Sequence, residues 1–110
     1  MTGQLDLFRA LADPTRLRIV HLLRAMELAV GEIALVVGQS QPRVSRHVRI
    51  LVEAGLVERR KEGSWVFLSI DGGAAAQALG AFLDEAPRSP SEDLWVEADL
   101  ARLAAVRAER

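Results

Sequence analysis

The sequence predicts a mainly α-helical domain that carries one β-hairpin. Apolar residues recur at three- and four-residue spacing through most of the chain, which is the pattern of amphipathic helices. Residues 56–70 instead form two short runs, LVERRK and SWVFLSI, on either side of a Glu62–Gly63 turn, which is typical of a hairpin. The 110 residues are half hydrophobic, which is enough for one compact core.

Three short helices are expected in the first 38 residues. Apolar residues at helical spacing (Leu5, Phe8, Leu11 and Ala12) predict an amphipathic helix over 5–12. Asp13 is suited to cap a second helix, and Pro14 then takes its first position, where the absent N–H costs nothing. A third helix is expected over 30–38, where Gly38 would end it.

The stretch SQPRVSRHVRILVEAG carries the signals of a fourth helix at both ends. The Ser40 hydroxyl can accept a hydrogen bond from the first backbone N–H groups, and Pro42 lies in the first turn. Gly55 is suited to the left-handed residue that closes a helix. A helical wheel turns one apolar face inward, made of Val44, Val48, Leu51 and Gly55.

The opposite face of this fourth helix is basic. Arg46 lies almost diametrically opposite the apolar face, flanked by Arg43, Arg49 and Ile50, with Ser45 and His47 on the two shoulders. Arginine can pair with guanine edges or phosphates, and Gln41, Ser45 and His47 can read base edges. The free N–H groups of the first turn, at Gln41, also favour anions. A basic helix face can equally be a solvated surface, so a second basic element is needed before the pattern indicates DNA binding.

The predicted hairpin supplies that second element. LVERRK runs into a turn at Glu62–Gly63, and SWVFLSI forms the returning strand. Arg59, Arg60 and Lys61 precede the turn and Ser64 follows it, so the tip could lie along a minor groove or a phosphate strand. Three basic residues could also protect an edge strand from aggregation.

Two further helices are expected after the hairpin. Residues 71–86 are alanine-rich and end before Pro87, and their small side chains would allow close helix–helix approach. Ser89, Pro90 and Glu92 form a capping-box pattern that predicts a last helix from about residue 90 onwards. We therefore expect one domain over 1–86 and a helical extension over 87–110.

The order of these elements predicts the function. Two helices joined across 38–40 form a helix-turn-helix, and the hairpin behind them makes it a winged helix-turn-helix. This arrangement indicates binding to double-stranded DNA. The candidate DNA-contacting residues are Ser40, Gln41, Arg43, Ser45, Arg46, His47, Arg49, Arg59, Arg60, Lys61 and Ser64.

Charge and composition are compatible with this function and exclude others. The net charge of −1 divides into +3 over residues 1–70 and −4 over residues 71–110, so the DNA-binding half is basic. The absence of cysteine excludes disulfides, thiolate metal sites and thiol redox switches. No signal peptide or long apolar run is evident, so we expect a cytoplasmic protein without membrane contact.

Two segments of the chain resemble the ArsR family of bacterial winged-helix repressors. They are LFRALADPTRLRIVHLL and ELAVGEIALVVGQSQPRVSRHVRILVEAGLVERRKEGSWVFLSI. The resemblance implies a homodimer whose interface combines the first helix with the alanine-rich helix near 74–85. It also implies that the dimer occludes a promoter until an effector releases it. The family's DNA-reading positions match Ser40, Gln41, Ser45, Arg46 and His47, with the wing at 59–65.

The chain departs from the family where many members sense metals. Their E-L-C-V-C pattern is replaced by Glu27-Leu28-Ala29-Val30-Gly31, and the 71–86 helix has no histidine for a zinc site. His21 and His47, the two histidines of the chain, lie on different predicted helices. We therefore expect no metal site and no cofactor, and an effector, if there is one, that acts without thiols.

Two alternatives and one open question accompany this interpretation. A catalytic function would need a nucleophile and base, or paired carboxylates, in one cleft, and no such residues converge in the sequence. A protein-interaction module that has lost its DNA role would not need the basic helix face. Residues 87–110 would either pack on the dimer body or connect to a further domain, as in ArsR-like domains that precede an S-adenosylmethionine-dependent methyltransferase.

Overall fold

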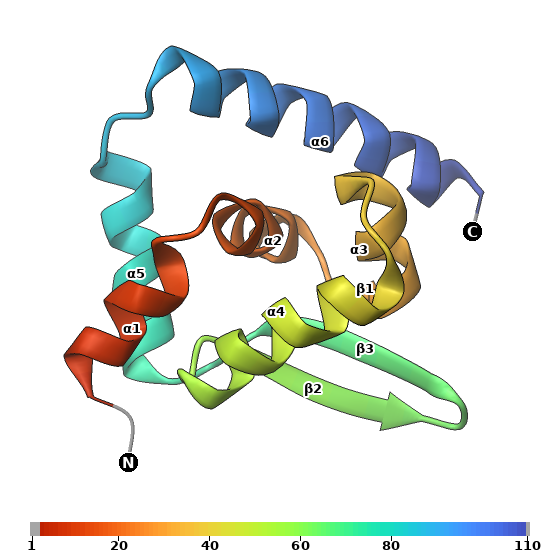
Figure 1. The fold of residues 1–110 in the computed structure, drawn as a ribbon, viewed down its shortest axis with the longest axis horizontal. Helices are drawn as coiled ribbons and strands as arrows, with labels where there is room; N and C mark the ends of the chain where they lie inside the picture. The colour runs from red at the N-terminus through yellow and green to blue at the C-terminus, as the bar shows by residue number, and fades with distance from the viewer. Residues whose placement is uncertain (1–2, 110) are drawn as a thin grey trace.

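A computed structural model describes residues 3–109 and has the predicted fold class (Figure 1). Within these residues, six helices and a small three-stranded antiparallel sheet are present, and the hairpin lies along one edge of the molecule. The elements in chain order are α1 (Gln4–Leu11), α2 (Pro14–Ala25), β1 (Leu28–Ala29), α3 (Val30–Val37), α4 (Gln41–Glu53), β2 (Val57–Glu62), β3 (Trp65–Ile70), α5 (Ala74–Glu85) and α6 (Pro90–Ala108).

The predicted helix starts are confirmed by their capping hydrogen bonds. The Asp13 carboxylate accepts from Arg16 N at 3.0 Å, and the Ser40 hydroxyl accepts from Arg43 N at 3.4 Å. Ser89 and Glu92 form the reciprocal capping box at the start of α6. These side chains replace the hydrogen bonds that a first helical turn lacks.

The hairpin forms as predicted, with a shifted turn and one additional strand. Glu62 pairs with Trp65, so the turn consists of Gly63 and Ser64 rather than Glu62 and Gly63. Gly63 has a φ of 62°, which glycine adopts without steric cost. The two-residue β1, which the sequence pattern did not indicate, pairs with β3 and gives the sheet order β1-β3-β2.

The hydrophobic core lies around α2, which is seen nearly end-on at the centre of Figure 1. Three residues of the predicted inward face of α4, Val44, Val48 and Leu51, are buried there, each at most 1% exposed. Gly55, which we expected on the same face, lies beyond the end of α4 and is exposed. Leu68 of β3 closes the core from the sheet side. Burying this apolar stripe directs the basic face of α4 outward.

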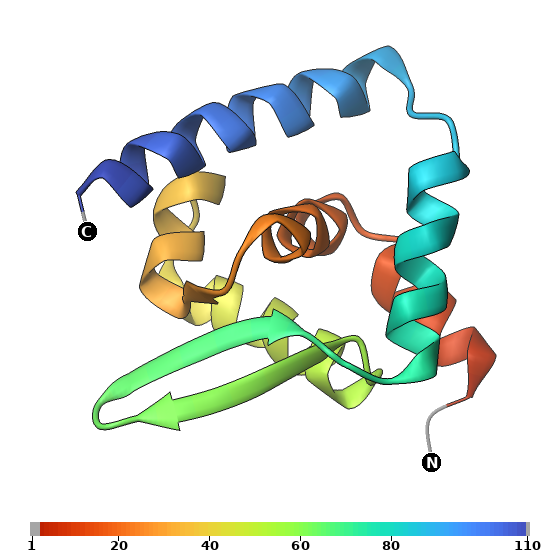
Figure 2. The same cartoon turned by 180° about the vertical axis from the view of Figure 1, so that it is seen from behind.

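α1 departs from the expected burial pattern. Leu5 and Phe8, which we expected on the apolar face of an amphipathic helix, are 60% and 66% exposed, whereas Ala10 is buried. Phe82 of α5 is also exposed. α1 and α5 occupy the same end of the molecule in both views (Figures 1 and 2).

α6 runs along the opposite side of the body from the hairpin and crosses from α5 towards α3 (Figure 2). It packs on α2 and α3, with Leu103 buried in the core and Asp99 buried beside it. The prediction of a helical extension over residues 87–110 agrees with α6, which packs against the helices of the winged helix-turn-helix.

Candidate nucleic-acid interface

The helix-turn-helix consists of α3, a short turn and α4. Gly38 ends α3 in the left-handed conformation with a φ of 70°, and its N–H bonds to the carbonyl of Ala34 at 3.0 Å. Ser40 then caps α4, so only three residues separate the two helices. Such a short connection fixes the direction of α4 relative to α3.

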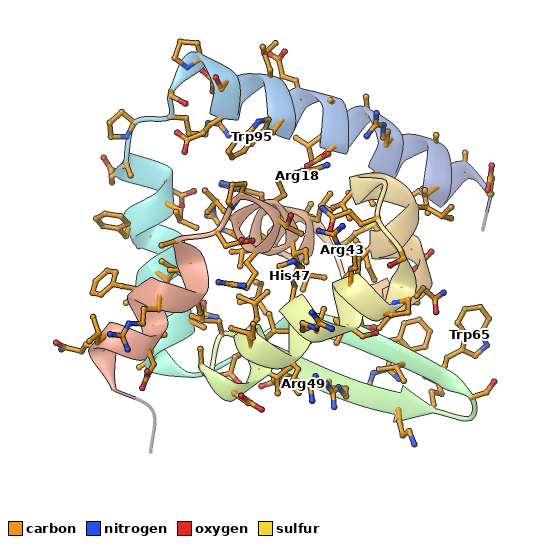
Figure 3. The ribbon with its side chains drawn as sticks, viewed as in Figure 1. Arg18, Arg43, His47, Arg49, Trp65 and Trp95 are labelled. Carbon is orange, nitrogen blue, oxygen red and sulfur yellow. The ribbon has the colours of Figure 1, made fainter. Side chains whose placement is uncertain are left out.

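The outward face of α4 carries the predicted arginines. Arg43, Arg46 and Arg49 are all exposed, and Arg43 and Arg49 are labelled along the helix in Figure 3. Ser40, Gln41 and Ser45 are exposed as well. This face combines positive charge for phosphates with hydroxyl and amide groups for base edges.

A cavity of about 410 Å³ joins α4 to the wing. Three of the predicted residues, Gln41, Ser45 and Ser64, line it together with Trp65. The Gln41 amide lies against Gly31 at the start of α3, where an added Cβ would come within 2.8 Å of Gln41 Nε2. The fold thus brings residues from two predicted DNA-binding elements into one cleft.

His47 does not lie with the outward arginines. Its side chain is 18% exposed, and its Nδ1 lies 3.2 Å from Arg16 Nη1 and 3.8 Å from Asp13 Oδ2. Because arginine can only donate, this contact is a hydrogen bond in the neutral tautomer of His47 that carries its proton on Nε2. The expected shoulder position of His47 is thus partly buried, with Nδ1 beside Arg16 and Asp13 at the α1–α2 junction.

The two shoulders of α4 differ because α1 covers one of them. On the wheel, His47 lies only about 40° from Leu51, and the side chain that extends this shoulder is Ile50. α1 packs against α4 there, so Ile50, which we expected beside Arg46 on the outward face, is half-buried against the core. Ser45, on the other shoulder, faces the cleft beside the wing.

The pKa of His47 is lowered from its usual value of 6.5. Burial of the ring is the main cause, because it disfavours the charged imidazolium. The Asp13 carboxylate opposes this shift, and the positive charges of Arg16, Arg43 and Arg46 add to it.

The basic residues of the wing divide between its two faces. Arg60 pairs with Glu27 at 2.8 Å and also with Glu62, and its guanidinium lies 4.8 Å from the centre of the Phe67 ring. The hydrogen bonds that Arg60 donates to these carboxylates raise its pKa. Phe67 in turn stacks on Trp65, with ring centres 6.2 Å apart.

Arg59 and Lys61 lie on the other face of β2, because side chains alternate along a strand. Both are exposed. Arg60 therefore organises the wing through ion pairs and ring contacts, whereas Arg59 and Lys61 extend from the opposite face. Sequence reasoning treated the three as equivalent, although the period of two could have separated them.

No group of three or more metal-ligating side chains occurs among residues 3–109. His21 of α2 is half-buried beside Trp95 and Glu92 of α6, far along the chain from His47 on α4. Within the same described range, no helix is long and apolar enough to cross a membrane.

Comparison with known proteins places this geometry in a family. The family model "Bacterial regulatory protein, arsR family" matches residues 13–59, which contain the helix-turn-helix. The arsenical resistance operon repressor of Escherichia coli is 43% identical over 89 residues, covering 80% of this chain and 75% of the repressor. The chain belongs to the ArsR family.

Two solved structures share its fold. HlyU from Vibrio cholerae superposes with a TM-score of 0.66 at 34% identity, covering 72% of this chain and 85% of HlyU. A Mycobacterium bovis homodimeric winged helix-turn-helix DNA-binding domain has a TM-score of 0.66 at 34% identity, covering 73% of each chain. This ArsR-family chain is a DNA-binding transcriptional regulator and not an enzyme.

The buried position of His47 predicts a pH-dependent stability. Between pH 6.5 and the lower pKa of the folded state, the unfolded chain binds more protons, so stability falls as the pH falls through this window. We expect His47→Gln to weaken the fall in the free energy of unfolding from about pH 8 to about pH 5. Urea denaturation of both proteins across this range measures the difference.

The matched control is Ser45→Gln, which changes the other shoulder of α4 and removes no titrating group. It is expected to keep the pH dependence of the parent protein. An unchanged pH dependence in His47→Gln would show that the His47 ring does not titrate differently on folding.

Proposed function

We propose that this ArsR-family regulator represses transcription as a homodimer that binds an imperfectly palindromic operator in the cytoplasm. The observation that carries the proposal is the exposed basic face of α4 beside a wing whose residues share its cleft. In this proposal α4 lies in a major groove, where Gln41 and Ser45 read base edges. Arg43, Arg46 and Arg49 then bind phosphates or guanines.

The wing would contact the DNA backbone beside the groove. Arg59 and Lys61 are the wing residues proposed to bind phosphates, and Ser64 at the turn lies next to the α4 cleft. Arg60 would act indirectly, since its ion pairs with Glu27 and Glu62 order the wing. His47 would contribute through Nε2 while Arg16 holds its other nitrogen.

The dimer proposal rests on α1 and α5. Leu5, Phe8 and Phe82 are each at least 60% exposed, and large apolar side chains on a surface mark protein contacts when they gather together. A two-fold dimer would present two copies of α4, which suits a palindrome. The homodimeric Mycobacterium bovis domain supports this assembly.

Release from DNA is proposed to involve an effector that acts neither on thiols nor through thiolate-bound metals. The chain has no cysteine, and thiophilic ions require thiolate ligands. The described residues also offer no cluster of three metal-ligating side chains for a site of nitrogen and oxygen ligands.

The first test is selection of genomic fragments with the purified protein, followed by sequencing. We expect half-sites about 34–36 Å apart, or a multiple of that spacing, bound by a dimer in light scattering. The logarithm of the binding constant should fall linearly with the logarithm of the salt concentration, with a slope of about −0.9 for each phosphate neutralised. A monomer that binds fragments indifferently to salt would refute the proposal.

Alanine substitutions in α4 and in the wing are expected to affect DNA binding in different ways. Gln41→Ala should cost about 1–3 kcal/mol on the selected operator and little on mixed-sequence DNA. Lys61→Ala should weaken both duplexes alike and reduce the salt slope by about one. Binding titrations on both duplexes at several salt concentrations separate the two effects, and the opposite result would reverse the assigned roles.

Operator binding is expected to be insensitive to arsenite, cadmium and peroxide, because the chain has no cysteine. It is expected to be insensitive to zinc as well, because the described residues contain no cluster of three metal-ligating side chains. The measurement is a DNA-binding titration in the presence of each compound, with circular dichroism as a check that the protein stays folded. Dissociation by any of them at micromolar concentration would contradict this expectation and reveal a metal-binding or oxidation-sensitive site.

A further inference from the structure

The buried charge of α6 lies at the end of α3 where the helix-turn-helix begins to turn. Asp99 is 4% exposed and receives two hydrogen bonds from the Arg18 guanidinium of α2, at 2.8 and 2.9 Å. Among the residues that the structure describes, Asp99 is the only charged residue that is buried. Figure 3 shows Arg18 between α2 and α6.

Arg18 also reaches α3. Its Nη2 donates to the carbonyl of Val37 at 3.3 Å, and Arg102 of α6 donates to the adjacent carbonyl of Val36 at 3.2 Å. These carbonyls belong to the last turn of α3, where the helix itself supplies no partners. Two cations at a helix C-terminus are favourable in charge as well as in hydrogen bonding.

The turn is held from α2 as well. Gln39 Nε2 donates to Thr15 Oγ1 at 2.9 Å, directly between Gly38 and the cap of α4. α4 starts at residue 41, so only three residues separate it from the C-terminus of α3. A movement of the α3 C-terminus would therefore be transmitted to α4. By holding the last turn of α3, the hydrogen bonds of Arg18 and Arg102 help to set the direction of α4.

Stability alone accounts poorly for this ion pair. Burying two charges costs desolvation energy, and apolar side chains in the same place often stabilise a protein equally well. α6 already has an apolar anchor in Leu103, which is 4% exposed. What an apolar pair would not provide is the directed hydrogen bond from Arg18 to Val37.

We propose that Asp99 is a positioning residue for DNA recognition, which orients Arg18 on the last turn of α3 and thereby sets the angle at which α4 meets DNA. The proposal rests on the proposed function. It makes α6 a part of the DNA-binding unit, although most of the DNA-contacting candidates lie more than thirty residues earlier in the chain.

The test uses Asp99→Asn in the full chain, with the selected operator and a mixed-sequence duplex as probes. Operator affinity is expected to fall roughly tenfold while affinity for the mixed duplex and the salt slope stay unchanged. Amide hydrogen exchange at residues 38–40 should become faster in the absence of DNA. Glu97→Gln, an exposed carboxylate on the same helix, is the control and should change neither quantity.

A double-mutant cycle tests whether Asp99 acts through Arg18. Once Arg18→Gln is present, adding Asp99→Asn should cause no further loss of discrimination between the two duplexes. Arg102→Ala removes the Val36 hydrogen bond without leaving a buried charge and should also reduce discrimination. It keeps the proposal testable if Asp99→Asn fails to fold.

Two outcomes would overturn the inference. One is a lower melting temperature with unchanged discrimination by the folded variants, which would make the ion pair a structural tether. The other is a set of additive losses in the cycle, which would mean that Asp99 acts independently of Arg18. Failure of the parent protein to prefer the operator would instead refute the proposed function.

Discussion

The burial of one apolar stripe on α4 is the constraint on which the DNA-binding surface depends. Val44, Val48 and Leu51 are nearly inaccessible to solvent, and their spacing fixes the rotation of the helix about its own axis. That rotation leaves Arg43, Arg46 and Arg49 outside. Because the same side chains also close the core, the direction of the basic face is tied to the stability of the whole domain.

The features predicted correctly from the sequence are those determined locally. Asp13, Ser40 and Ser89 cap helices because a side-chain oxygen close to free N–H groups needs no distant partner. The apolar stripe of α4 and the alternation of β3 are likewise properties of one element. These signals were sufficient for the fold class and for the outward arginines.

The features that differed depend on which element packs beside which. The half-burial of His47 and Ile50 requires knowing that α1 covers that shoulder of α4. β1 is two residues long and exists through its pairing with β3, so no periodicity could announce it. The ion pair of Arg60 with Glu27 could not be predicted locally, because the two residues are thirty-three positions apart in the chain.

The contact between Gly31 and Gln41 has a consequence for how this protein could change over time. Gly31 matches the second cysteine of the E-L-C-V-C pattern, and the space beside it is filled by the Gln41 amide. A mutation that installed a sulfur ligand at this position would push aside a side chain proposed to read the operator. In this fold a sulfur ligand at residue 31 and the Gln41 amide would therefore compete for the same small volume.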